Sequence, residues 1–183
     1  MGLDISVISQ MSPVEIPEGI EKWSDEYYDW EADLGKGSLW SIWRDRNFPR
    51  QSEGLPDADV VESEGETYSF RAGSYSGYGE WRNDLALAAG YEGGSEGVWI
   101  KADEGAYGGP FEELINFPDN EGIIGPVISK KLYNDFINYE EEVYKAIDHW
   151  YLKMDPTKEY DGDDLKWFKL KYEDWKHSFK LAS

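Results

Sequence analysis

The stretch YSFRAGSYSGYGEWR, residues 68–82, decides how this sequence is interpreted. Its first four residues alternate aromatic and polar side chains, a pattern typical of a β-strand. Small residues from Ala72 to Gly79 predict a loop, and from Glu80 onward the composition favours a helix. A helix that starts after such a loop has backbone N–H groups without intrahelical partners, and such groups bind anions. The strand, loop and helix start therefore form a candidate ligand site.

The candidate site combines cationic, hydroxyl and aromatic side chains. Two arginines would hold the charged part of a polar or anionic ligand, serine hydroxyls would bind the same part, and tyrosine rings would stack on a flat group. The alternative is structural: the glycines permit a tight connection, the serines cap the helix, and the arginines pair with nearby acids. The proposed ligand-binding set around the loop is Arg71, Ser74, Tyr75, Ser76, Tyr78, Trp81 and Arg82.

A second candidate is the turn Asp119-Asn120-Glu121, between two apolar segments with helical patterns. The carboxylates of Asp119 and Glu121 would accept hydrogen bonds from the same ligand. The alternative is that Asp119 and Asn120 shape the turn and that Glu121 is solvated. The ligand spacing of an EF-hand is absent, which favours a turn over a metal site. We assign no catalytic residue, cofactor or metal.

Composition narrows the class of protein. The 183 residues include 38 acidic and 18 basic side chains, for a formal net charge of -20 at pH 7. Direct nucleic-acid binding is not expected, because phosphate binding needs clustered lysine and arginine. Aromatic residues make up 16% of the chain, which argues against disorder. The absence of cysteine, of a signal-like N-terminus and of an apolar run of about 20 residues predicts a cytoplasmic protein with no membrane partner.

Two long apolar stripes predict the C-terminal helices. The first runs from Leu132 to Ile147 at spacings of three and four, with Ser129 as a candidate N-cap. The second runs from Leu165 to Phe179 with the same periodicity. A short loop separates the two stripes, so we expect them to pack as an antiparallel helix pair.

The remaining pattern predicts a single α+β domain over residues 1–183, with a small β-sheet and three to five helices. Residues 3–8 and 66–71 alternate as strands, and residues 80–89 form a helix that Gly90 ends. The acidic segment 18–34 is either a short amphipathic helix or a solvated excursion. The glycine-rich segment 91–109 is expected to be an exposed loop, with one strand-like piece at 98–100.

Several segments resemble a family of uncharacterised proteins encoded by bacteriophages and prophages. The resemblance spans most of the chain, and it implies a phage origin, and hence the cytoplasm of an infected bacterium, without implying a mechanism. Segments 18–34 and 91–109 correspond to variable regions. The matching segments are GLDIS at 2–6, FRAGSYSGYGEWRNDLA at 70–86, GPFEELINFPDNEGIIGP at 109–126, KLYNDF at 131–136 and KYEDWKHSFKLA at 171–182.

Three hypotheses about function follow from the sequence. The leading one is a phage accessory protein that binds a small polar or anionic ligand and sequesters a nucleotide-derived signal of host defence. The second is an acidic protein that blocks a host defence factor through its surface, as a DNA mimic does. Residues 1–35 carry nine acids and one base, which suits that role. The third is a nucleotide hydrolase that uses Asp119 or Glu121.

Overall fold

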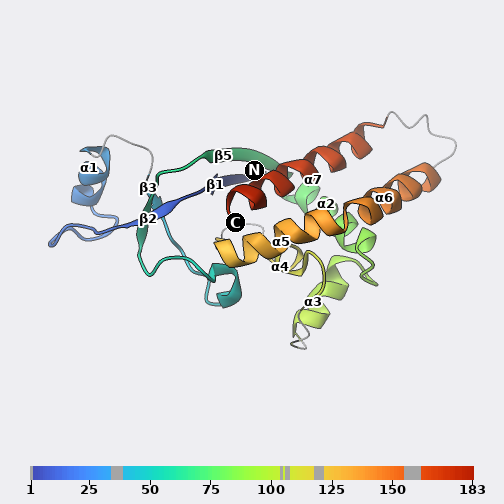
Figure 1. Ribbon diagram of the computed structural model, residues 1–183, viewed down its shortest axis with the longest axis horizontal. Helices are drawn as coiled ribbons and strands as arrows, with labels where there is room; N and C mark the ends of the chain where they lie inside the picture. Colours follow the sequence, from blue (N-terminus) through green and yellow to red (C-terminus); the bar gives the residue numbers. More distant parts are fainter. Residues whose placement is uncertain (1, 34–38, 104, 106–107, 118–121, 155–161) are drawn as a thin grey trace.

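The computed structural model describes residues 2–33, 39–103, 105, 108–117, 122–154 and 162–183. Within these residues it has seven α-helices and two small antiparallel sheets, so the predicted α+β class is confirmed. The molecule is elongated, with the strands toward one end and most helices toward the other (Figure 1).

The first sheet is a ribbon of two strands that runs toward the helices (Figure 1). Strand β1 (Gly2–Ile8) pairs antiparallel with β5 (Thr67–Ser74), so that Gly2 lies opposite Ser74 and Ile8 opposite Thr67. The alternating patterns predict both strands. Strand β5 continues beyond the predicted end at Arg71, because its last residues pair with Gly2 and Leu3 across a β-bulge.

The second sheet has three short strands in the order β2-β4-β3: β2 (Met11–Val14), β4 (Val60–Ser63) and β3 (Leu39–Ser41). The central strand β4 is anchored by Val60 and Val61, which are almost fully buried. Strand β2 contains Pro13, which is tolerated because β2 lies at the edge of this sheet. A 3-10 turn, η1 (Pro49–Ser52), precedes β4.

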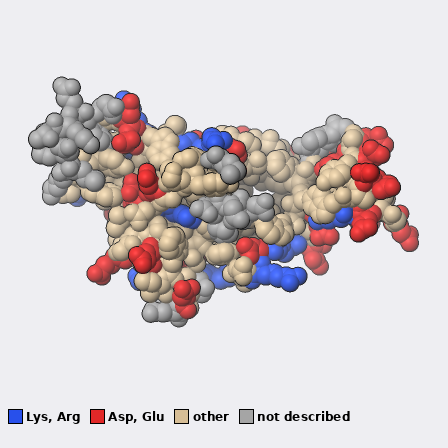
Figure 2. All heavy atoms as spheres, turned by 180° about the vertical axis from the view of Figure 1, so that it is seen from behind, with Lys and Arg blue, Asp and Glu red and all other residues tan. Residues whose placement is uncertain are grey.

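Helix α1 (Asp25–Asp33) stands at the strand end of the molecule and realises the helical alternative for segment 18–34. Its buried side chain is Tyr27, which packs against Trp23 and Trp30. Acidic side chains gather on the end of the molecule that carries α1, at the right of Figure 2. This end is therefore strongly negative.

The other helices are α2 (Tyr75–Ala88), α3 (Ser95–Asp103), α4 (Glu112–Ile115), α5 (Pro126–Asn138), α6 (Glu140–Met154) and α7 (Asp163–Leu181). Helix α7 runs back along α5 and α6, which confirms the antiparallel C-terminal packing (Figure 1). The core lies between these helices and α2. One of its polar links is a hydrogen bond of 2.7 Å from the Tyr172 hydroxyl to the Phe136 carbonyl.

Four predictions about helices are wrong in detail. Helix α2 begins at Tyr75 and not at Glu80, and α3 occupies the middle of the segment expected to be an exposed loop, including the strand-like piece at 98–100. The predicted helix 132–147 is two helices that meet at Tyr139. Its N-cap is Gly125, followed by Pro126, and Ser129 is buried within α5.

Candidate functional site

The glycine-serine turn is built as a capped helix start. Ser74 ends β5 and is the N-cap of α2, where its hydroxyl oxygen accepts a hydrogen bond from the Gly77 N–H at 3.0 Å. The hydroxyl oxygens of Ser74 and Ser76 lie 3.1 Å apart. The cap satisfies one of the N–H groups that the sequence offers to a ligand. These contacts are the ones expected if the serines cap the helix and bind no ligand.

Arg71 lies on the exposed face of the β1–β5 ribbon. Its Nη1 is 3.2 Å from a carboxylate oxygen of Asp4, the residue opposite it on β1. Both side chains are more than half exposed, so the pair contributes little to stability. Tyr75 is exposed beside the two serines. The structure thus gathers Ser74, Tyr75 and Ser76 at the surface, with Arg71 held in an ion pair.

The other members of the predicted site point into the protein. Tyr78 and Trp81 are each 1% exposed, and the Trp81 indole N–H donates to the Phe168 carbonyl at 3.2 Å. Arg82 is also buried, where it donates to the Phe117 carbonyl and lies 4.9 Å from the Tyr78 ring. All three side chains are therefore part of the core packing around α2.

Asp119 and Glu121 lie outside the described residues, so their part in ligand binding stays a prediction. A different group of acids, Glu112, Glu113 and Asp135, is buried or partly buried near α4. Lys131 binds the carboxylates of Glu113 and Asp135 at 2.5 and 2.8 Å, and the Phe111 N–H donates to Asp135 at 2.8 Å. Burial raises the pKa of Asp135, while Lys131 opposes the shift.

This acid group has a structural explanation. Phe111 has a φ of 58°, a left-handed conformation that is unfavourable for a bulky residue. The hydrogen bond to Asp135 fixes that conformation. Glu112 accepts hydrogen bonds from the N–H groups of Gly108 and Gly109, at 2.6 and 3.1 Å. No group of three or more histidine, cysteine or acidic residues among those described is arranged to hold a metal ion.

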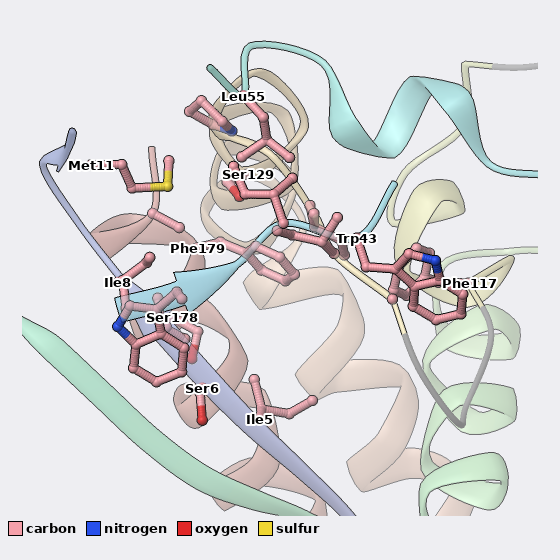
Figure 3. Close-up of a pocket in the computed structure, with 18 of the residues that line it drawn as sticks. Ile5, Ser6, Ile8, Met11, Trp43, Leu55, Phe117, Ser129, Ser178 and Phe179 are labelled. Carbon is pink, nitrogen blue, oxygen red and sulfur yellow. The ribbon is translucent and has the colours of Figure 1, made fainter. Parts of the chain in front are cut away.

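A cavity of about 420 Å³ lies between the strands and the C-terminal helices. This volume falls in the range of about 300–1,000 Å³ that is usual for small-molecule sites. The walls come from β1, the β2–β4–β3 sheet, the loop after η1, α2, the described residues between α4 and α5, α5 and α7. Figure 3 shows Ile8 and Met11 on one side of the cavity, Trp43 and Phe117 on the other, and Phe179 between them.

Most of the cavity lining is apolar, but three polar atoms of its lining residues are buried with no hydrogen-bond partner in the described structure. They are Nε1 of Trp40, the hydroxyl of Ser129 and Nε1 of Trp175. An unpaired buried donor costs about 1–3 kcal/mol, so native proteins keep few of them. Three of the eight such atoms in the described structure belong to residues that line this one cavity.

Several other serine and tryptophan groups are paired. Ser178, which also lines the cavity, donates its hydroxyl to the Asp174 carbonyl at 2.8 Å. The indoles of Trp81 and Trp99 donate to the carbonyls of Phe168 and Ile115. Unpaired buried hydroxyls are not confined to the lining, because the Ser95 hydroxyl at the start of α3 is a further example.

Sequence patterns do not reveal this site, because its residues come from segments between Leu3 and Ala182. One available signal is the alternation along β1, where Leu3, Ile5 and Val7 share a face. That pattern predicts an inward face but cannot distinguish a packed face from one that borders a cavity.

Comparisons with models of protein families, with curated protein sequences and with solved structures give no match. Within the described ranges, no helix combines the length and the apolar character needed to cross a membrane. Arguments about function therefore depend on the chemistry of the site.

Proposed function

We propose that this protein binds a small molecule in the cavity between its strands and its C-terminal helices. The ligand has an apolar body, which the aliphatic and aromatic walls would accommodate, and at least one acceptor oxygen. The observation that carries the proposal is the set of three unpaired buried donors, on Trp40, Ser129 and Trp175. A carbonyl, ether or carboxylate oxygen that reached one of these donors as the lining adjusts would complete its hydrogen bond and remove part of a penalty that the ligand-free protein bears.

The proposal keeps the small-molecule role expected from the sequence and moves the ligand from the glycine-serine turn to the cavity. The cap made by Ser74 and the burial of Tyr78 and Trp81 favour a structural role for the turn. For the biological context we retain the expectation from the resemblance, in which a phage accessory protein sequesters a molecule of its host. The hydrolase hypothesis depends on Asp119 and Glu121 and stays a prediction.

The first experiment is mass spectrometry of small molecules extracted from the protein purified under native conditions. The second is a titration with the apolar fluorophore anilinonaphthalene sulfonate. Ile5→Phe adds volume at a cavity residue, and Ile100→Phe makes the same change on α3, where Ile100 is 53% exposed. We expect Ile5→Phe to weaken fluorophore binding at least tenfold and Ile100→Phe to leave it unchanged. Equal binding by the two variants would refute the cavity as the site.

The acidic end of the molecule supports a second candidate function, the blocking of a basic surface on a host protein. Trp23 is 55% exposed and Tyr28 is 50% exposed there, among the acids of segment 18–34. Exposed aromatic rings beside carboxylates suit a partner rich in lysine and arginine. A pull-down from host lysate tests this role. The captured protein should dissociate at high salt and should be lost in the double variant Asp25→Lys/Asp29→Lys, whereas Ile5→Phe should retain it.

A further inference from the structure

A second hollow, of about 750 Å³, adjoins the cavity and shares Ile8, Met11, Pro126 and Ala182 with it. The lining of the second hollow is more polar than that of the cavity. It includes Gln10, Glu66, His177 and Lys180, and it opens beside the last turn of α7. A ligand that spanned both hollows would therefore have apolar walls around one end and polar side chains around the other.

Lys180 differs from the other lysines of α7. Lys166, Lys169, Lys171 and Lys176 each form an ion pair with a carboxylate, at 2.7–3.1 Å. Lys180 forms none within the described part of the chain, although the sequence has 38 acidic residues. Its position in the last turn of α7 is favourable for a cation, because the carbonyl end of a helix is negative. The place of Lys180 in the last turn of α7 explains why a cation is favourable there. It does not explain why no carboxylate pairs with that cation.

His177 lies one helical turn before Lys180, so both side chains leave the same face of α7 toward the hollow. The His177 ring stands edge-on to the Tyr68 ring, with the centroids 4.7 Å apart, which orients the imidazole. The acidic side chain in the lining is the exposed Glu66. Lys180 is the one Lys or Arg side chain in this lining, and a single cation suits a singly charged anionic group better than a multiply charged one.

We infer that the ligand is an anionic amphiphile, with its apolar chain in the cavity and its carboxylate head group at Lys180 and His177. The inference depends on the proposed function and adds the class of ligand. The unpaired donors of the cavity would bind an acceptor oxygen within the chain, such as an amide or ketone carbonyl. Lys180 would supply the charge-assisted hydrogen bond to the head group.

The test uses two probes that differ only in charge at the head group: N-dodecanoylglycine and its methyl ester. Each is titrated by calorimetry into the wild-type protein, Lys180→Gln and Lys166→Gln. Lys166→Gln is the matched control, because it removes the same charge about 21 Å away along α7. Lys180 is exposed, so its replacement should leave the fold intact, and circular dichroism checks this.

We expect the wild-type protein to bind the acid more tightly than the ester. Lys180→Gln should weaken binding of the acid about two- to fivefold, the effect of an exposed ion pair, and leave the ester unchanged. Lys166→Gln should alter neither. Equal affinity of the wild-type protein and Lys180→Gln for the acid would refute the head-group site and leave the cavity standing. If neither probe binds the wild-type protein, the proposed function itself fails.

Discussion

The unpaired hydroxyl of Ser129 leads to a prediction of unusual sign: its removal should stabilise the ligand-free protein. Ser129 lies on α5 with 1% of its surface exposed, and its hydroxyl has no partner in the described structure. Ser129→Ala deletes that hydroxyl while keeping Cβ, so no large cavity is added. Most replacements of buried residues destabilise a protein, typically by about 1 kcal/mol. Here the deleted group carries an unrecovered desolvation cost.

The magnitude follows from that cost. A buried hydroxyl without a hydrogen bond costs about 1–3 kcal/mol, and alanine is a better helix former than serine by a few tenths of a kcal/mol. We therefore expect Ser129→Ala to raise the free energy of unfolding by about 1–2 kcal/mol. For a chain of this length, that is a rise in Tm of about 2–8 °C. The same change should weaken ligand binding, because it removes one donor from the cavity.

The control is Ser178→Ala, in the same cavity but with a hydroxyl that donates to the Asp174 carbonyl. It gains the same helix propensity and loses a hydrogen bond, so its free energy of unfolding should fall by about 0–1 kcal/mol. Urea denaturation of all three proteins, stripped of bound molecules by partial unfolding and dialysis, measures the difference. If Ser129→Ala is as destabilising as Ser178→Ala, the hydroxyl is not unpaired in solution and the argument for the cavity loses its main support.

Three further changes test the packing and the ends of the helices. Lys131→Met should lower the free energy of unfolding by about 3 kcal/mol, because it removes a cation from the buried Glu113 carboxylate; adding Glu113→Gln should recover part of the loss in urea denaturation. Gly90→Ala should cost about 1–2 kcal/mol, since Gly90 ends α2 with a φ of 86°, and Gly90→Asn should cost less in the same assay. Burial raises the pKa of Asp84, so the folded protein holds that proton more tightly than the unfolded chain and loses stability as pH rises above about 4. Asp84→Asn keeps an acceptor for the Tyr151 hydroxyl. In denaturation experiments the variant should be more stable than the wild type at pH 7 but not at pH 4. A gain in stability that is independent of pH would contradict the raised pKa of Asp84.

The elements that sequence patterns predict are those whose side chains follow one period. Strand β1 alternates, and the stripe of α7 from Phe168 to Phe179 is buried as its spacing indicates. Gly90 ends α2 as expected, because glycine accepts the left-handed conformation at that position. In each case the local preference and the tertiary contacts agree.

The start of α2 shows where local preference fails. The residues after Ser74 include Gly77 and Gly79, and glycine disfavours a helix by about 1 kcal/mol per residue. Burial of Tyr78 and Trp81 against α7 outweighs that cost, and the helix begins early. The sequence contains both the glycines and the aromatic residues, but it does not show which of them the tertiary packing favours.

The small-molecule role inferred from the sequence stays a prediction. The described residues nominated for it include a helix cap, an exposed ion pair and part of the core. No local motif marks Trp40, Ser129 and Trp175, because they converge only when a short sheet, α5 and α7 come together. The charge of Lys180 is visible in the sequence, but its lack of a carboxylate partner is a property of the fold.

The position of the cavity has a mechanical consequence. Its walls belong on one side to the three-stranded sheet and on the other to α5 and α7. A bound molecule would contact both parts, and it would replace the empty space between them with van der Waals contacts. The ligand-bound protein should therefore be more rigid than the ligand-free protein. Slower proteolysis at the strand end of the molecule would report that the cavity is occupied.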